Sequence, residues 1–141
     1  MIHRWKRRLF TNRLKQLRSR DAYAQWARDY PPIPHNKLME IEQSTMLSLM
    51  PDLSHQRVLD LACGTGRYGL IAQSSGASTV IGIDDSYAML KQSPLQSLCL
   101  GSMAKIPVAS RCLDVVLCGL AVGHYWDLTE ILAEIARILV P

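Results

Sequence analysis

Apolar runs and helical patterns alternate along the second half of the chain. Four short apolar runs predict strands at Arg57–Leu61, Thr79–Ile83, Leu98–Leu100 and Cys112–Leu117. Helical patterns between and after them cover Arg67–Ser74, Ser86–Gln92 and Leu128–Leu139. Alternation at this spacing is typical of parallel strands joined by right-handed crossover helices. The pattern therefore predicts an α/β fold whose doubly wound, mostly parallel sheet has about four strands.

The first part of the chain predicts helices and no strand. Asp21–Tyr30 fits a short helix, which ends before the prolines at 31, 32 and 34 because proline cannot continue it. Asn36 suits the N-cap of a second helix that ends near Met50. The predicted apolar face of this helix carries Leu38, Ile41, Thr45 and Leu49. We therefore divide the chain into a leader (1–20), a helical segment (21–56) and an α/β domain (57–141).

The predicted sheet would be short at its C-terminal end. The chain stops at Val140-Pro141, where a doubly wound sheet would normally turn and add another strand. Four strands with an exposed last edge are unusual for an independent domain. We therefore expect a domain that lacks its later strands or is completed by a partner.

Charge separates the leader from the rest of the chain. The net charge is +4, but residues 1–20 contain eight of the sixteen Lys and Arg residues and no acidic residue. The remaining chain has eight basic and twelve acidic residues, so it gives no support to a nucleic-acid-binding core. The leader fits a basic amphipathic helix that contacts an anionic membrane surface or a protein, a presequence, or a nucleic-acid arm. A solvated helix without such a role is the simplest interpretation.

Cysteine spacing indicates the compartment. The four cysteines include no C-x-x-C pair and lie in or beside apolar runs. We interpret them as buried free thiols in a reducing compartment, the cytoplasm, and expect neither a disulfide framework nor a metal site. No apolar run reaches the roughly 18 residues of a membrane span.

The stretch Val58–Gly69 carries the candidate chemistry. A strand enters a turn with Gly64 and Gly66, where the missing Cβ atoms let backbone approach a ligand, and a helix follows. Asp84 closes the next strand, twenty positions after Gly64, where an acid can accept hydrogen bonds from both hydroxyls of a ribose. We expect these residues to form a nucleoside-binding site.

Two classes of ligand fit this turn. Gly64-x-Gly66-x-x-Gly69 also satisfies the fingerprint of dinucleotide-binding domains, so an NAD-dependent oxidoreductase is an alternative. Asp60 argues against it, because a carboxylate on the approach to the turn would repel the phosphates of a dinucleotide. S-adenosylmethionine carries an ammonium and a sulfonium and no phosphate. The chemistry of Asp60 therefore favours the sulfonium cofactor.

Several motifs resemble those of one family. Val58–Gly66 (VLDLACGTG) resembles the first motif of class I methyltransferases, and Val80–Leu90 (VIGIDDSYAML) resembles their second. Later blocks of the family are similar to Gly101–Pro107, Leu113–Val116 and Leu128–Pro141, and its aromatic N-terminal segment is similar to Ala22–Tyr30. The resemblance is to the small-molecule, type 11 branch, with the C-terminal part missing. It implies a Rossmann-like fold, S-adenosylmethionine as cofactor and methyl transfer to a small-molecule acceptor.

The resemblance also implies roles for single residues. Asp60 and the backbone of Ala62, Cys63, Gly64 and Gly66 would contact the methionine moiety. Asp84 would hold the ribose. The residues around the adenine would be Asp85, Met89, Ser102 and Met103. The sequence departs from the family at Ser102, where an acid is common, and at Ala62, where glycine is common.

The methyl-transfer pocket is expected after the fourth strand. The resemblance places Leu120, His124 and Tyr125 there, and the carboxyl end of a parallel strand is where α/β sheets bind ligands. His124 and Tyr125 are candidates for contact with the acceptor, and no catalytic residue is assigned. Tyr23 or Tyr30 is a candidate lid. Asp114 is expected to be structural, and Cys63 is not expected to act as a nucleophile. A non-catalytic remnant that binds cofactor or serves as a scaffold stays open as an alternative.

Overall fold

The protein was analysed as a computed structural model, which describes residues 19–141. Residues 1–18 of the predicted leader (1–20) therefore lie outside the described residues, and so do the membrane or protein contacts expected of the leader. The last two positions of the leader, Ser19 and Arg20, begin the first helix of the structure.

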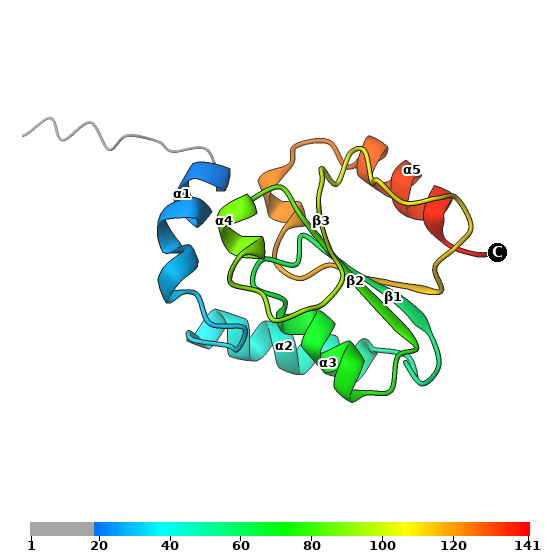
Figure 1. The fold of residues 1–141 in the computed structure, drawn as a ribbon, viewed down its shortest axis with the longest axis horizontal. Coiled ribbons are helices and arrows are strands. Elements are labelled where there is room, and N and C mark those ends of the chain that lie inside the picture. The colour runs from blue at the N-terminus through cyan, green and yellow to red at the C-terminus, as the bar shows by residue number, and fades with distance from the viewer. Residues whose placement is uncertain (1–18) are drawn as a thin grey trace, which may run out of the picture.

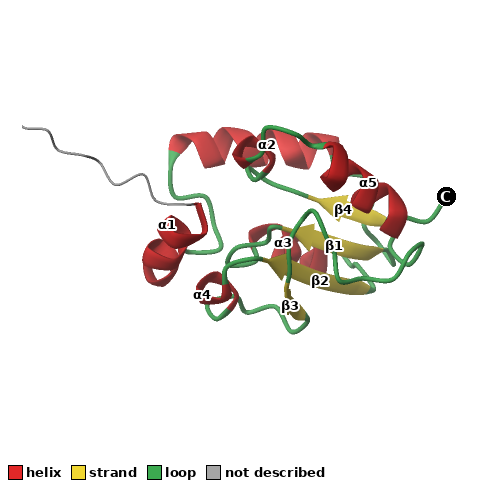
Figure 2. Ribbon diagram, turned by 90° about the horizontal axis from the view of Figure 1, so that it is seen from above, coloured by secondary structure: helices red, strands yellow, loops and turns green. Residues whose placement is uncertain are grey.

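Four parallel strands form the sheet. They are β1 (Arg57–Leu61), β2 (Thr79–Asp84), β3 (Leu98–Leu100) and β4 (Val115–Leu117), in the spatial order β3-β2-β1-β4. The chain steps outward from β1 to β3 and then returns to the other side of β1, as Figure 2 shows. This doubly wound order confirms the predicted Rossmann-like fold and creates a reversal point between β1 and β4.

Helices cover both faces of the sheet and one of its ends. They are α1 (Ser19–Trp26), α2 (Lys37–Leu49), α3 (Arg67–Ser74), α4 (Tyr87–Leu90) and α5 (Thr129–Ile138). Short 3-10 helices follow at Ala27–Asp29 and Val122–His124. In Figure 1, α2 and α3 lie on one side of the sheet and α5 on the other, while α1 and α4 pack together at one end.

Most predicted elements occur within a residue or two of their expected bounds, and one strand is shorter. The apolar run Cys112–Leu117 predicted a single strand, but only Val115–Leu117 pairs with β1. The amides of Cys112 and Leu113 instead donate to the carbonyl of Ile138 at the end of α5. The first half of the run therefore serves to hold α5 against the sheet.

The predicted apolar face of α2 was wrong. Leu38, Ile41 and Leu49 are 65%, 57% and 77% exposed. The helix begins as predicted, because the Asn36 side chain accepts a hydrogen bond from the amide of Met39 at 3.0 Å. Its inward face carries Met39, Glu42, Gln43 and Met46, so two polar residues occupy positions that an apolar pattern would not select.

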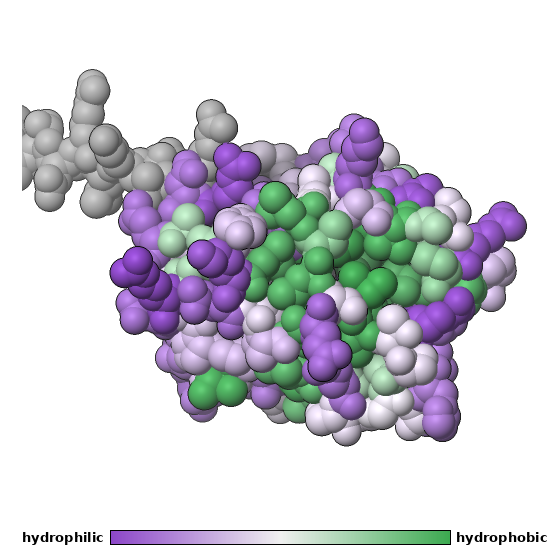
Figure 3. Space-filling model, in the orientation of Figure 1, coloured by the Kyte–Doolittle hydropathy of each residue, from purple (hydrophilic) through white to green (hydrophobic). Residues whose placement is uncertain are grey.

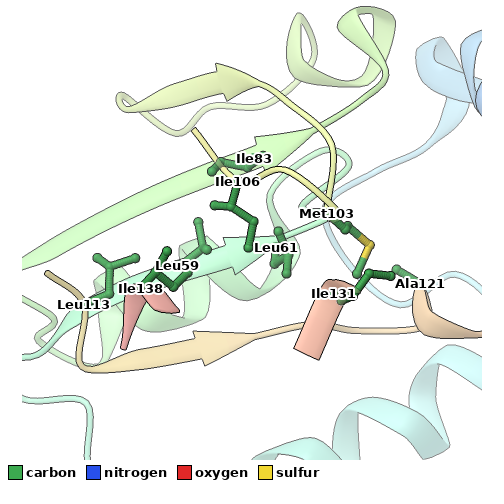
Figure 4. Packing of buried hydrophobic residues seen from close by; sticks show 9 residues of the cluster. All are labelled: Leu59, Leu61, Ile83, Met103, Ile106, Leu113, Ala121, Ile131 and Ile138. Carbon is green, nitrogen blue, oxygen red and sulfur yellow. The ribbon is translucent and has the colours of Figure 1, made fainter. Parts of the chain in front are cut away.

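Two apolar layers hold the sheet between its helices. Leu59 and Leu61 of β1 point toward α5, where they pack with Ile83, Ile131 and Ile138 (Figure 4). The layer on the α3 side contains Val58, Tyr68, Ala72, Val80 and Leu117. Alternate residues of β1 therefore face opposite layers, and this places Asp60 on the α3 side, among apolar residues.

An ion pair fixes the amino-terminal end of the central strand. Asp114 accepts hydrogen bonds from the backbone amide of Arg57 at 2.8 Å and from its Nε and Nη2 at 2.9 and 2.7 Å. These contacts join the start of β1 to the residue before β4. Asp114 therefore has the structural role that the sequence predicted.

The edge strand β3 lies under an apolar surface area. On the face shown in Figure 3, apolar side chains gather in the middle, over the region of β2 and β3, and polar residues surround them. Leu100 of β3 is 56% exposed.

Two neighbouring positions of α5 provide a test of its packing. Ile131 is 1% exposed and Leu132 is 58% exposed. Ile131→Ala should lower the free energy of unfolding by about 2–5 kcal/mol, because it leaves a cavity in the core. Leu132→Ala should change it by less than about 0.5 kcal/mol. Urea unfolding of both variants measures this, and equal losses would contradict the register of α5.

Candidate functional site

A cavity lies at the carboxyl ends of the strands. Segments that follow each strand line it: 62–65 after β1, Asp85 and Met89 after β2, Gly101 and Met103 after β3, and 119–121 with His124 and Tyr125 after β4. Tyr23, Tyr30, Pro31 and Met39 line it from the N-terminal helices. The cavity thus sits at the reversal point between β1 and β4, where open α/β sheets bind ligands.

The turn after β1 presents backbone to the cavity. Ala62 and Gly64 both have positive φ, at 56° and 54°. A Cβ atom on Gly64 would meet no protein atom within 4 Å, so this position faces open space. Ala62 occupies the left-handed region with a side chain, which is unfavourable for residues other than glycine. Both residues line the cavity, together with Cys63.

Gly66 and Gly69 serve packing. A Cβ atom on Gly66 would lie 2.6 Å from the hydroxyl of Ser93, and one on Gly69 would lie 2.5 Å from a methyl of Leu95. Neither glycine is among the residues that line the cavity. The third glycine of the fingerprint-like spacing therefore allows close packing of α3, and the expected contact of Gly66 with a ligand finds no support in its position.

Asp60 is a buried carboxylate that caps α3. It is 2% exposed, and its Oδ2 accepts a hydrogen bond from the amide of Gly69 at 2.7 Å. Gly69 is the third residue of α3, so its amide is one of those without a partner inside the helix. The N-cap residue Gly66 has no side chain that could accept this hydrogen bond. Asp60 therefore takes that role from the neighbouring strand.

Burial changes the ionisation of Asp60. Its pKa is raised to about 7, mainly because burial disfavours the charged form, and the negative charge of Asp84 adds to the shift. The hydrogen bond from Gly69 and the positive charge of Arg67 act in the opposite direction. Asp60 also lines the cavity. A cationic group bound there would stabilise the charged carboxylate.

Asp84 connects the ends of β1 and β2. Its Oδ2 accepts a hydrogen bond from the amide of Gly64 at 2.8 Å, and its Oδ1 accepts one from the amide of Ser86, also at 2.8 Å. Burial raises its pKa, while these two hydrogen bonds lower it. Each carboxylate oxygen has capacity for a second hydrogen bond. Asp84 lines the cavity and therefore keeps acceptor capacity for two hydroxyl groups.

The residues expected around an adenine separate into two groups. Asp85, Met89 and Met103 line the cavity, as does Ile83 of β2. Ser102 is exposed and is not among the lining residues, and its hydroxyl accepts a hydrogen bond from the amide of Ala104 at 3.2 Å. The Ser102 side chain is thus used in a local turn.

The N-terminal helix meets the segment after β4 at the mouth of the cavity. The hydroxyl of Tyr23 and the Nε2 of His124 lie 3.2 Å apart, and their rings meet edge to face. Burial raises the pKa of Tyr23, so its hydroxyl stays protonated. Leu120 and Tyr125 line the cavity nearby, with Leu120 at a positive φ of 56°. Tyr23 and Tyr30, the candidate lid residues, both line the cavity.

A charged network joins α2 to the start of α3. Arg67 donates from Nη2 to Glu42 Oε2 at 2.8 Å and from Nη1 to Gln43 Oε1 at 3.2 Å. Glu42 also accepts a hydrogen bond from the hydroxyl of Tyr68 at 2.7 Å. Arg67 and Tyr68 line the cavity and were absent from the predicted site. The signal that could have found them is the polar pair Glu42-Gln43 in a helix that otherwise packs apolar residues.

Within the described residues, the four cysteines form no disulfide and belong to no cluster of potential metal ligands. All four are free thiols, and no group of three His, Cys, Asp or Glu side chains in residues 19–141 is placed to hold a metal ion. Burial raises the pKa of the Cys63 thiol and raises that of Cys118 to about 11. Cys63 therefore stays protonated, which agrees with its expected role as a spacer in the turn.

Comparison with known proteins decides the family. A family model described as a methyltransferase domain matches residues 59–141, more than half of the chain. The chain belongs to this methyltransferase-domain family. The matched region begins within β1 and runs past β2, β3 and β4. This match confirms the family to which the turn and the later blocks are similar.

Relatives of this methyltransferase domain are longer proteins. The malonyl-[acyl-carrier protein] O-methyltransferase of Pectobacterium atrosepticum is 30% identical over 114 residues, which are 76% of this chain and 45% of that protein. The enzyme of the same name from Hamiltonella defensa is 29% identical over 97 residues, 66% of this chain and 37% of that protein. The chain thus spans less than half the length of these curated relatives.

A solved structure supports the same fold. An S-adenosylmethionine-dependent methyltransferase from Mesorhizobium loti superposes with a TM-score of 0.66 at 24% identity, over 71% of this chain and 48% of that one.

Among the helices of residues 19–141, none has the length and apolar character to cross a membrane.

Asp60→Asn tests whether the buried carboxylate destabilises the fold. Because the pKa of Asp60 is raised to about 7, the folded state binds more protons than the unfolded state between pH 4 and 7. The free energy of unfolding of the wild type, relative to Asp60→Asn, should therefore fall as pH rises through this window, by on the order of 3 kcal/mol. Asparagine keeps an oxygen for the amide of Gly69.

Urea unfolding of both proteins at pH 4.5, 6 and 8 measures the difference. Comparing the two proteins removes the contributions that both share, such as those of Asp114 and Glu134, whose pKa values are lowered to about 2. A constant difference between pH 4.5 and 8 would show that Asp60 titrates normally.

Proposed function

We propose that this methyltransferase domain binds S-adenosylmethionine in the cavity and transfers its methyl group to a small-molecule acceptor beside His124 and Tyr125. The observation that carries the proposal is the charge of the cavity: Asp60, Asp84 and Asp85 line it, and Arg67 is the one Lys or Arg side chain among its described lining residues. A negative cavity attracts a ligand with an ammonium and a sulfonium. Free thiols are consistent with the cytoplasm as its compartment.

The residues present fit this cofactor. Asp60 would attract the ammonium of its amino-acid half, and the open space beside Gly64 would let its backbone approach. The spare lone pairs of Asp84 would accept the two ribose hydroxyls. Met89, Met103 and Ile83 offer apolar walls for the adenine. Tyr23 and Tyr30 would exclude water from the N-terminal side.

The cofactor supplies a methyl group on a sulfonium, whose leaving thioether is neutral. The protein then needs chiefly to hold the acceptor in line with the methyl carbon. A general base is required only where the acceptor must lose a proton. The Nε2 of His124 lies within hydrogen-bonding distance of the Tyr23 hydroxyl, and we assign His124 and its neighbour Tyr125 to the wall of the acceptor pocket. The related malonyl-[acyl-carrier protein] O-methyltransferases act, by their name, on a malonyl group.

The same cavity disfavours a dinucleotide. The pyrophosphate of NAD would lie near Asp60, at the start of a helix whose third amide already binds this carboxylate. The negative charges of a carboxylate and a pyrophosphate repel each other, most strongly where water is excluded. The close packing of Gly69 against Leu95 is the role that the third glycine also has in dinucleotide-binding domains, so the glycine spacing does not separate the two ligands.

Calorimetric titration with S-adenosylhomocysteine tests the proposal. Wild-type chain should bind it and should not bind NAD. Asp84→Asn should weaken binding by at least about tenfold, because hydrogen bonds to a charged acceptor contribute about 1.5–3 kcal/mol. Asp52→Asn is the matched control: Asp52 also accepts a backbone hydrogen bond, from Ser54 at 2.9 Å, but does not line the cavity.

Each outcome of the titration has a separate meaning. Binding of NAD instead would contradict S-adenosylmethionine as the ligand of this cavity. A folded chain that binds neither ligand would favour the non-catalytic remnant or scaffold.

A further inference from the structure

A second cavity adjoins the first, on the side of the N-terminal helix. Its volume is about 440 Å³, which lies within the range of about 300–1,000 Å³ that small-molecule sites occupy. The two cavities share five lining residues, which are Tyr23, Tyr30, Met39, Leu120 and His124. A molecule held in the second cavity therefore lies next to the His124 side of the first. The function proposed above gives this second cavity no role.

Aromatic rings form much of the wall of the second cavity. The ring of Tyr23 is met at near right angles by three others: Trp26 at 85°, Tyr30 at 78° and His124 at 86°. The distances between the ring centroids are 5.5, 6.0 and 5.8 Å. Rings at right angles cannot all stack on one flat ligand, but they can surround a compact group from several sides. Sites that recognise alkylammonium ions are built in this way.

The charge of the second cavity also favours a cation. Asp29 is the only Asp, Glu, Lys or Arg side chain among the described residues that line it. Asp29 ends the short 3-10 helix between Trp26 and Tyr30, so its carboxylate follows one ring closely in the chain and precedes the other. A carboxylate attracts an ammonium and repels a carboxylate or a phosphate, and the face of an aromatic ring attracts the same positive charge.

We propose that the second cavity binds an alkylammonium group of the methyl acceptor. The ammonium is not the nucleophile, because a positively charged nitrogen has no free electron pair. Another atom of the same acceptor would extend past Leu120 and His124 into the first cavity and receive the methyl group there. This role in methyl transfer rests on the proposed function, whereas binding of the ammonium does not. Trp26 and Asp29 thus select the acceptor by its charge.

Choline and its neutral isostere, in which a carbon atom replaces the nitrogen, isolate the effect of the charge. Both compounds are titrated into the wild-type chain at low salt, where screening is weakest, and binding is followed by NMR. The wild type should prefer choline by at least about tenfold. This preference equals about 1.4 kcal/mol, an amount that two or three cation–ring contacts can supply together.

Trp26→Leu tests the contribution of a ring. Trp26 is 54% exposed, so its removal leaves the hydrophobic core intact. The variant should lower the preference for choline by about threefold, because tryptophan is the ring that attracts cations best. Trp126→Leu is the matched control: Trp126 is also an exposed tryptophan, and it lines neither cavity. This control should keep the preference of the wild type.

Asp29→Asn tests the carboxylate and leaves every ring in place. It should also lower the preference for choline, and it keeps the proposal testable where Trp26→Leu disturbs α1. Asp21→Asn is its control, because Asp21 is an exposed acid in the first turn of α1 that lines neither cavity. Asp21→Asn should bind both compounds as the wild type does.

Titration of the same samples with S-adenosylhomocysteine separates the ammonium site from the proposed function. A wild-type chain that binds S-adenosylhomocysteine but binds choline and its isostere equally would keep the cofactor and overturn the ammonium site. A preference for choline that survives both Trp26→Leu and Asp29→Asn would also overturn it. Selective binding of choline by a folded chain that does not bind S-adenosylhomocysteine would confirm the ammonium site and overturn its role in methyl transfer.

Discussion

The hydrogen bond from the amide of Gly69 to Asp60 joins the central strand to the first crossover helix. Asp60 lies near the end of β1, a strand with neighbours on both sides, in a layer that is otherwise apolar. Because the N-cap position of α3 is a glycine, the helix relies on this carboxylate for an amide that would have no partner. The turn between them carries the positive φ values of Ala62, Gly64 and Gly66. This contact therefore helps to fix the turn that lines the cavity after β1.

A buried carboxylate that caps a helix is an unfavourable way to stabilise a fold. Its pKa near 7 means that burial outweighs the hydrogen bond, so the charged form is destabilised at neutral pH. An asparagine or a serine would cap without this penalty. A cationic ligand changes the balance, because its positive charge offsets the loss of water around the carboxylate. The conflict between local stability and site chemistry is typical of functional positions.

The fold was largely predictable because its elements have strong local patterns. The β-branched run Thr79–Ile83 and the start of α2 at Asn36 each follow from one clear signal. The error at α2 has the opposite cause: its inward face is fixed by the pairing of Glu42 with Arg67, a contact between residues 25 positions apart. A method that looks for the spacing of apolar residues does not detect two charged residues that are buried because they pair with each other. Arg67 and Tyr68 were absent from the predicted site for the same reason, since their contacts with Glu42 join residues far apart in the sequence.

The predicted site residues divide into those that line the cavity and those that do not. Those at the end of a strand or within a few residues after it, such as Asp84 and Leu120, line the cavity because topology alone brings the strand ends together. Gly66 and Ser102 do not, because the first packs against Ser93 and the second closes its own turn. A glycine's role depends on what its missing Cβ would touch, and that is a property of the folded chain.

The ionisation of Asp60 is the most direct test of this account. The carboxyl carbon of Asp60 can be followed by NMR as pH is changed, with and without S-adenosylhomocysteine. The account predicts a pKa near 7 in the free chain, and a marked fall when the ammonium of the ligand is bound. A pKa near 4 in the free chain, or a raised pKa that the ligand leaves unchanged, would contradict it.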